Sequence, residues 1–343
     1  MEVLDVQDGQ VTVRMTPDAA LPFVGLLPES GEWYAQMAQA PVPATCAGAM
    51  NCVTRTYELV FGDGPVIGEM VKADEYFFAP ARPELALGTP VQELSVAIGA
   101  QWDLGGGEAI AWFVPPSSGD LVVVGVHGRG GAREEMLRLA SIVVSQGHGM
   151  LIVGYRGDGV APDSPDGLGH FGVTEWVDVA MAMRHPQIPA DARFVMAGNS
   201  QGAALIAQLL RDGDIADRVD GIILDSPLIA LDATMERQAQ LAGIPPVLTR
   251  PVLESAYLVS RFRGFNFAHG EHVEFLAASS LPILLFHGPD DQFVPGEPSD
   301  SLAQRNPDID YERAEGVDHV RFWNADPAAY AEATKRFLVK VTS

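Results

Sequence analysis

The chain has 343 residues, of which 47% are hydrophobic, so it can build one large domain or a core domain with an extension. Its glycines and prolines follow no fixed period, which excludes collagen-like and low-complexity proteins. With 45 acidic and 22 basic residues, the formal net charge is -23. Such a surface repels a polyanion, so we expect no nucleic-acid partner.

The first part of the chain, residues 1–91, is predicted to be a β-rich N-terminal extension. Short alternating stretches such as 11–14 and 54–61 are separated by many prolines and glycines. This region holds Cys46 and Cys52, which are too few for a disulfide framework and match no common metal-site spacing. We expect two reduced thiols, and a single local disulfide only in an exported protein.

Neither a signal peptide nor a membrane span is predicted. The first ten residues are acidic and lack an apolar core segment. No apolar run reaches the ~18 residues that a membrane helix needs. We therefore expect a cytoplasmic protein.

From residue 92 the pattern changes to alternating strands and helices. Stretches 93–98 and 108–114 flank the turn-rich segment 99–107 and predict a hairpin. The run 121–127 is continuously apolar, which is typical of a strand buried on both faces. The further predicted strands are 150–155, 193–198, 221–225, 282–287 and an edge strand at 309–314; the predicted helices are 133–145, 174–183, 203–211 and 327–339. This alternation predicts a mostly parallel sheet covered by helices.

One segment, residues 227–280, interrupts the alternation. It contains two predicted helices, 228–241 and 247–262, followed by Phe265, Phe267 and Phe275. Insertions of this size are usually functional, and we interpret this one as a small helical lid. Alternatively, its apolar residues simply pack the helices against the rest of the protein.

The candidate nucleophile is Ser200, in the sequence Gly-Asn-Ser-Gln-Gly between the predicted strand 193–198 and the helix 203–211. A serine at a sharp strand-to-helix turn projects its hydroxyl above the sheet, and small residues two positions before and after prevent collisions. A helix N-terminus also favours developing negative charge. The alternative is a structural turn with a surface serine.

A second glycine-rich loop, His-Gly-Arg-Gly-Gly at 127–131, follows the first buried strand. Acyl transfer requires backbone N–H donors that face the oxyanion. One donor is expected to be the amide of Gln201, and the other the amide of Arg129, with Gly130 as the second choice. A phosphate-binding loop is the alternative, but the dinucleotide fingerprint is incomplete and no H-E-x-x-H pattern exists, so we expect no cofactor and no metal.

Two further loops contain a candidate acid and a candidate base. The segment 286–295 follows a predicted strand and contains Asp290 and Asp291, either of which suits a triad acid or a solvated acidic turn. Asp225, at the end of another strand, is a rival acid. His319 lies before the final helix and completes the order Ser, Asp, His.

Together these motifs resemble the α/β-hydrolase superfamily over residues 92–343; they read GNSQG, HGRGG, HGPDDQFVP and DHV. More narrowly, the sequences YRGDG, TEW, LDSP and WN are similar to bacterial serine hydrolases related to the serine aminopeptidase and prolyl-oligopeptidase branches. The resemblance implies an α/β-hydrolase fold: a mostly parallel central sheet flanked by helices, a small helical lid and a β-rich N-terminal extension. The resemblance favours Asp291 over Asp290, because the family acid is the fifth residue of the run that begins with His-Gly at the strand end. The family histidine matches His319. Ala203 departs from the second glycine that many relatives carry.

The resulting expectation is a serine hydrolase that cleaves a small-molecule carboxylic ester through an acyl-enzyme. His319 takes the proton of Ser200, Asp291 stabilises the imidazolium, and the amides of Gln201 and Arg129 bind the oxyanion. A peptidase or amidase acting on short peptides is the second interpretation. A binding protein of the same fold without turnover is the third.

Overall fold

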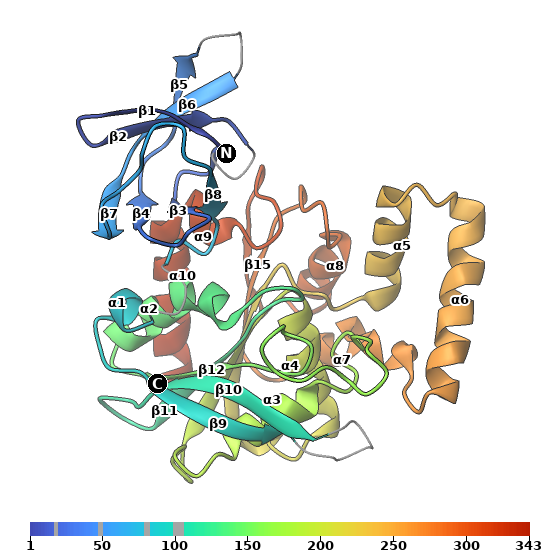
Figure 1. The fold of residues 1–343 in the computed structure, drawn as a ribbon. Helices are drawn as coiled ribbons and strands as arrows, with labels where there is room; N and C mark the ends of the chain where they lie inside the picture. Colours follow the sequence, from blue (N-terminus) through green and yellow to red (C-terminus); the bar gives the residue numbers. More distant parts are fainter. Residues whose placement is uncertain (17–19, 47–50, 79–82, 99–105) are drawn as a thin grey trace. The chain divides into compact units, whose positions relative to one another are not determined.

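The computed structural model describes residues 1–16, 20–46, 51–78, 83–98 and 106–343 (Figure 1). These residues form two compact units. The first contains Met1–Thr89 and Trp323–Tyr330, and the second contains Pro90–Phe322 and Ala331–Ser343. Each unit has its own hydrophobic core, so each is described separately.

The first unit is β-rich, as predicted, and consists of two four-stranded antiparallel sheets. Val11 and Val13 alternate toward its core because successive side chains of a strand point to opposite faces. The stretch 54–61 divides at Tyr57, so that its two halves belong to different sheets. The first sheet has the order β1 (Val3–Gln7), β2 (Gln10–Arg14), β6 (Asn51–Thr56), β5 (Val42–Thr45), and the second has the order β7 (Glu58–Phe61), β4 (Tyr34–Met37), β3 (Val24–Pro28), β8 (Val71–Asp74). The short helix α1 (Pro83–Leu87) follows.

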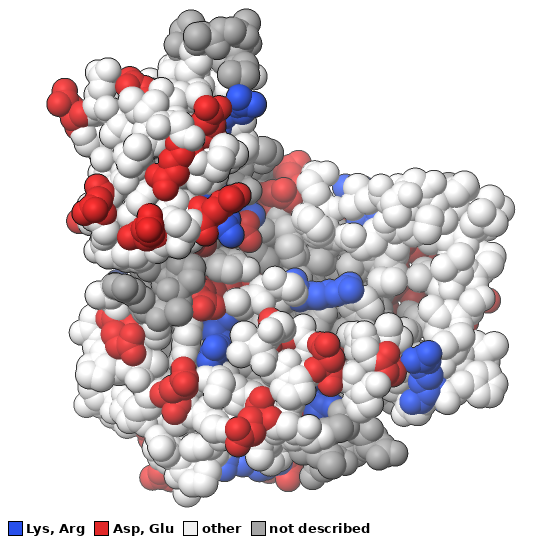
Figure 2. Space-filling view, in the orientation of Figure 1, with Lys and Arg blue, Asp and Glu red and all other residues white. Residues whose placement is uncertain are grey.

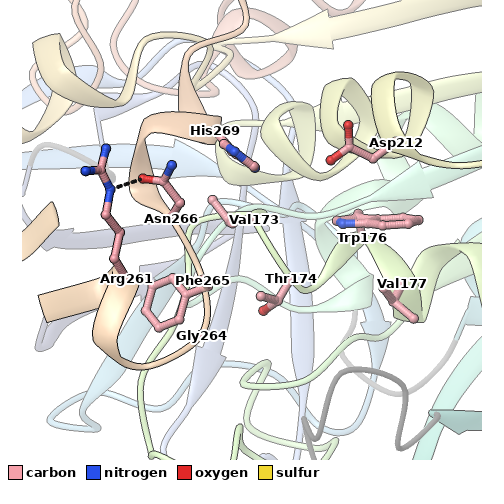
Figure 3. A pocket seen from close by; sticks show the side chains of 10 residues that line it. All are labelled: Val173, Thr174, Trp176, Val177, Asp212, Arg261, Gly264, Phe265, Asn266 and His269. Atoms are coloured by element: carbon pink, nitrogen blue, oxygen red, sulfur yellow. Dashed lines mark hydrogen bonds between the residues drawn. The ribbon is translucent and has the colours of Figure 1, made fainter. Parts of the chain in front are cut away.

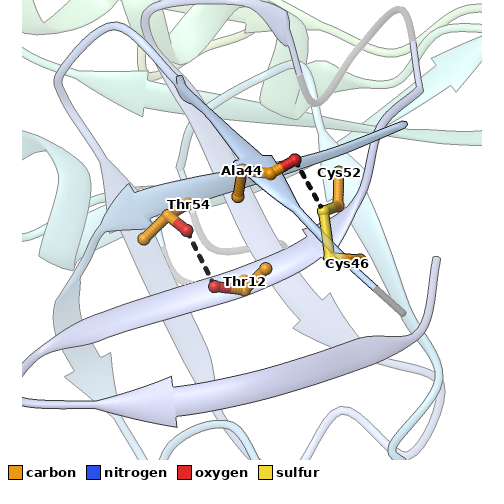
Figure 4. Close-up of a disulfide and its surroundings, with 5 residues drawn as sticks. All are labelled: Thr12, Ala44, Cys46, Cys52 and Thr54. Atoms are coloured by element: carbon orange, nitrogen blue, oxygen red, sulfur yellow. Dashed lines mark hydrogen bonds between the residues drawn. A yellow bond between two sulfur atoms is a disulfide. The ribbon is translucent and has the colours of Figure 1, made fainter. Parts of the chain in front are cut away.

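The expectation of two reduced thiols is wrong, because Cys46 and Cys52 form a disulfide (Figure 4). Strands β5 and β6 are antiparallel neighbours in which Ala44 pairs with Cys52, and this register brings the two cysteines to a Cα separation of 6.3 Å. A count of two cysteines could not reveal the pairing. The cytoplasmic location stays a prediction.

The second unit contains the predicted central sheet, which is mostly parallel. Its eight strands have the order β9 (Gln92–Ile98), β10 (Gly107–Val114), β12 (Gly149–Val153), β11 (Leu121–Val126), β13 (Arg193–Asn199), β14 (Val219–Asp225), β15 (Ile283–His287), β16 (Asp310–Arg313). Strand β10 is antiparallel to β9 and β12, and the remaining pairs are parallel. The hairpin prediction is confirmed, although most of its turn lies outside the described residues. Strand β16 is at the edge, as expected.

Helices flank this sheet, as the alternating pattern predicts (Figure 1). Every residue of β11, β12 and β15 is buried, which explains their continuous apolar sequences. The expected helix 133–145 begins with a 3₁₀ turn, and α8 was not predicted. The helices of this unit are η3 (Arg133–Met136), α2 (Leu137–Ser145), α3 (Trp176–Met183), α4 (Gln201–Asp212), η4 (Ala216–Arg218), α8 (Glu297–Arg305) and most of α10 (Pro327–Thr342), whereas α9 (Phe322–Ala325) belongs mainly to the first unit.

The insertion between β14 and β15 contains a pair of neighbouring helices, α5 (Leu231–Leu241) and α6 (Pro246–Phe262), then η5 (Phe267–Gly270) and α7 (Val273–Ala277) (Figure 1). Within α6, Leu253 is 5% exposed whereas Phe262 is 84% exposed, so burial accounts for only some of the apolar residues of this helix. Phe275 packs against the main core in α7, so it is not part of the helical pair.

Candidate active site

Ser200 lies at the turn between β13 and α4 with φ 50° and ψ −117°, a conformation that residues other than glycine rarely adopt. Its N–H donates to the carbonyl oxygen of Asp225 at 2.9 Å, and its own carbonyl accepts from the N–H of Leu228 at 3.0 Å. The end of β14 and the start of the insertion therefore hold this turn in place.

The two glycines around Ser200 are required by close backbone packing. A Cβ atom on Gly202 would lie 2.1 Å from the carbonyl oxygen of Val126, at the end of β11. A Cβ on Gly198 would lie 2.7 Å from the nitrogen of Ala203. Side chains at these positions would push α4 away from the sheet, which is the steric reason behind the sequence motif.

Among the three candidate acids, Asp291 is the carboxylate that contacts His319. Its Oδ2 atom lies 2.7 Å from His319 Nδ1, and Asp291 is 4% exposed. Asp290 instead accepts a hydrogen bond from the N–H of Gly316 at 2.7 Å. Asp225 accepts one from the hydroxyl of the next residue at 3.2 Å. The structure thus brings together His319 and the carboxylate that the family resemblance favours.

Asp291 has further partners, which sequence reasoning missed. Its Oδ1 atom accepts from the backbone N–H groups of Phe293 and Val294, each at 2.8 Å, and its Oδ2 atom lies 3.1 Å from His287 Nε2. Burial alone would raise the pKa of Asp291, but the hydrogen bonds from His287 and His319 outweigh it and hold the pKa well below the usual range. His287 ends β15 four residues before the acid, which is the signal that could have revealed its role.

The end of β14 also connects the nucleophile with the loop of the base. Asp225 binds the N–H of Ser200, and the adjacent Ser226 accepts a hydrogen bond from the N–H of Val320 at 2.9 Å. Val320 directly follows His319. Two consecutive residues therefore hold both segments at the carboxyl end of one strand, where ligands of such sheets commonly bind.

The predicted oxyanion loop lies against the nucleophile. A Cβ on Gly128 would lie 3.1 Å from the Cβ of Ser200. Arg129 and Gly130 follow at the exposed surface, and Gly130 has φ 68°. Gln201 is the first residue of α4, where N–H groups have no partner inside the helix. All three predicted donors therefore belong to segments that contact or contain Ser200.

Glu135, which the sequence did not single out, links this loop to the nucleophile turn. Its Oε1 atom accepts from Gly128 N at 3.3 Å and from Asn199 Nδ2 at 2.7 Å, and the residue is 6% exposed. The hydroxyl of Tyr155 also contacts this loop, donating to the carbonyl oxygens of His127 at 3.1 Å and Gly128 at 3.2 Å. The only sequence signal for Glu135 is an acidic residue just after the glycine-rich loop.

The insertion contacts both the acid loop and the region of the oxyanion loop. Gln238 in α5 donates to the carbonyl oxygen of Phe293 at 2.8 Å. Phe267 in η5 packs edge-on against Phe171, with 5.9 Å between ring centroids, and the guanidinium of Arg129 lies 4.9 Å from the Phe171 centroid. The predicted lid segment thus lies close to the candidate site.

A cavity of about 350 Å³ lies elsewhere, where the start of α3, the end of α4 and the end of α6 meet (Figure 3). It is lined by Val173, Thr174, Trp176, Val177, Asp212, Arg261, Gly264, Phe265, Asn266 and His269. None of the predicted catalytic residues is among them. This cavity therefore does not belong to the Ser200 site.

Within the described part of the chain, no three His, Cys, Asp or Glu side chains form a cluster that could hold a metal ion. No helix among the described residues has the length and apolarity needed to cross a membrane.

Comparison with known sequences identifies distant relatives. No family model matches the chain. The relatives include YfhR of Escherichia coli, described as an uncharacterized protein, from strains K12 and O157:H7. Each is 24% identical over 197 residues, which cover 56% of this chain. The match spans 61% of the length of these relatives.

Comparison with solved structures identifies the fold. Similar structures include the esterase Pf2001 of Pyrococcus furiosus, with a TM-score of 0.57 and 19% identity over 76% of this chain and 94% of that protein. Mouse alpha/beta hydrolase domain-containing protein 10 has a TM-score of 0.52 and 16% identity over 74% of this chain and 100% of its own. The esterase RhEst1 of Rhodococcus sp. ECU1013 has a TM-score of 0.51 and 18% identity over 74% and 100%. The predicted α/β-hydrolase fold is confirmed, and the resemblance to the peptidase branches stays a prediction.

Proposed function

We propose that this protein is a serine hydrolase that cleaves carboxylic esters through an acyl-enzyme. The observation that carries the proposal is the hydrogen bond between Asp291 and His319. The end of β14 binds both the loop that contains His319 and the turn that contains Ser200. The strained turn at Ser200 and its two required glycines are what a nucleophile elbow needs.

In the proposed reaction, each catalytic residue has a defined part. With Nδ1 of His319 donating to Asp291, Nε2 is the nitrogen that accepts the Ser200 proton as the oxygen attacks the ester carbonyl. His319 then protonates the departing alcohol, and it later activates the water that releases the acid. Because the pKa of Asp291 is lowered, this carboxylate stays ionised and stabilises the imidazolium. The amides of Gln201 and Arg129, or of Gly130 in place of Arg129, stabilise the oxyanion.

The insertion, residues 227–280, is proposed to act as a lid on this site. Its contacts through Gln238 and Phe267 connect it with the acid loop and with Phe171 beside the oxyanion loop. Residues 1–91 are proposed to be an extension that precedes the catalytic domain, 92–343.

The test compares wild type with Ser200→Ala and with the control Ser255→Ala, which changes an exposed serine of α6. On p-nitrophenyl esters of graded acyl length, S200A is expected to lose at least ~10³-fold of turnover, whereas S255A keeps it. A fluorophosphonate probe should label wild type and S255A but not S200A.

Other results would select another function. Full activity of S200A would remove the serine mechanism. Faster cleavage of aminoacyl anilides than of esters would indicate a peptidase or amidase. Ligand binding by a protein that the fluorophosphonate probe never labels would indicate a binding protein.

A further inference from the structure

Arg129 is an exposed arginine in the loop next to the candidate nucleophile. It directly follows Gly128, whose Cβ position lies 3.1 Å from the Cβ of Ser200. Within the residues that the structure describes, no acidic side chain forms an ion pair with Arg129, whereas exposed arginines elsewhere, such as Arg184 and Arg313, have such partners. The chain has 45 acidic and 22 basic residues, and acidic side chains occur at many places on the face shown in Figure 2.

The carboxylates in this region are already occupied by other donors. Burial and the charges of Glu135, Glu175 and Asp158 raise the pKa of Tyr155, whereas the charge of Arg129 lowers it. Each of the three carboxylates accepts at least two hydrogen bonds from backbone or side-chain amide groups. The N–H donors of the Arg129 guanidinium are therefore available to an external anion.

The ring of Phe171 lies beneath the guanidinium. Arg129 Cζ lies 4.9 Å from the Phe171 centroid, and Phe171 packs against the cluster of Ala204, Leu228, Leu231 and Val294. Ala204 is in the first turns of α4, and the N–H of Leu228 binds the carbonyl oxygen of Ser200, so this cluster adjoins the nucleophile. Stacking on a ring orients a guanidinium and leaves the donors at its edge free for a carboxylate, which it can bind with two parallel hydrogen bonds.

We infer that the acyl group cleaved at this site is an apolar chain that ends in a carboxylate, so that the substrate is a monoester of a dicarboxylic acid. The inference rests on the proposed function. Arg129 binds the distal carboxylate with its side chain, and the partly exposed ring of Phe171 contacts the methylene groups. One acyl group is then bound at both ends. The backbone of the 127–131 loop binds its ester carbonyl, and the side chain of Arg129 binds its distal carboxylate.

The experiment compares monomethyl adipate with methyl hexanoate, which has the same chain length but no carboxylate. Methanol release yields kcat/KM for each ester in wild type, Arg129→Met and Arg129→Lys. The control is Arg184→Met, which removes one exposed positive charge just after α3, outside the insertion. Wild type is expected to prefer the anionic ester, and the ratio of the two kcat/KM values should fall about 10- to 100-fold in R129M, less in R129K, and not in R184M. Because the ratio is taken within each variant, a general loss of activity cancels.

The outcomes separate the inference from the function on which it rests. If folded wild type hydrolyses neither these esters nor p-nitrophenyl esters, the proposed function fails. If it hydrolyses both methyl esters and R129M keeps the wild-type ratio, the substrate inference is overturned and the esterase proposal stands. An equal fall in R184M would also overturn it, because the effect would then come from total charge. Calorimetric titration of adipate into S200A and into S200A combined with R129M provides a readout without turnover, and binding should be lost in the double variant.

Discussion

Asp291 Oδ2 lies 2.7 Å from His319 Nδ1, which makes Asp291 the carboxylate that orients the candidate base. Replacing Asp291 with asparagine should lower kcat for an ester by about 10³-fold or more, because a neutral amide stabilises the imidazolium poorly and favours the wrong tautomer. Steady-state kinetics on a p-nitrophenyl ester measures the loss.

Two neighbouring acids provide matched controls for that variant. Asp290→Asn and Asp225→Asn should each cost much less turnover, because their carboxylates bind Gly316 and Ser226 rather than His319. A larger loss in folded D225N than in D291N would assign the role of the acid to Asp225.

Glu135 is expected to position the oxyanion loop against the nucleophile turn. Glu135→Ala leaves the donors Gly128 N and Asn199 Nδ2 without their buried acceptor, whereas Glu135→Gln retains an oxygen at the same place. We expect kcat of E135A to fall about 10- to 100-fold with little change in KM, and E135Q to stay close to wild type. Equal losses in both variants would indicate that the charge, rather than the acceptor, matters.

Gly202 is predicted to tolerate no side chain. In Gly202→Ala the new Cβ would meet the carbonyl oxygen of Val126 at 2.1 Å, and backbone atoms cannot move aside cheaply. The variant should lose about 2 kcal/mol or more of unfolding free energy and most of its activity. Gly169→Ala is the control, because a Cβ at that exposed glycine meets nothing within 4 Å. Thermal unfolding of the two variants should separate them clearly.

Burial raises the pKa of Asp225 to about 6, although the charges of Arg138 and His319 oppose the increase. Between pH 4 and 6 the folded protein therefore keeps a proton that the unfolded chain releases, so the free energy of unfolding falls as pH rises through this window. The contribution is on the order of 3 kcal/mol by pH 7.

Urea unfolding at pH 4.5 and 7 tests this contribution. Asp225→Asn should gain stability relative to wild type as pH rises, and the exposed Asp308→Asn should not. The same pH dependence in wild type and D225N would contradict the assignment.

The disulfide between Cys46 and Cys52 closes a short loop in the first unit. Replacing both cysteines with serine should lower the stability of that unit by about 2 kcal/mol, because the unfolded chain gains conformational freedom. A reducing agent should lower the melting temperature of wild type and leave the double variant unchanged. Identical melting of reduced and oxidised wild type would argue against a stabilising bridge.

Local signals in the sequence determined the fold class, the strand-to-helix turn at Ser200 and the candidates for its partners. A strand buried on both faces, such as β11, requires a continuous run of apolar residues. The close packing at Gly202 requires a glycine. Both requirements can therefore be recognised in the sequence. The family resemblance favoured Asp291 as the partner of His319, and the structure shows their contact across 28 residues. Only the tertiary structure revealed the hydrogen bond between Glu135 and Asn199, which are 64 residues apart, and the disulfide between Cys46 and Cys52. These contacts depend on how strands and loops pack, and the spacing of residues along the chain does not reveal them.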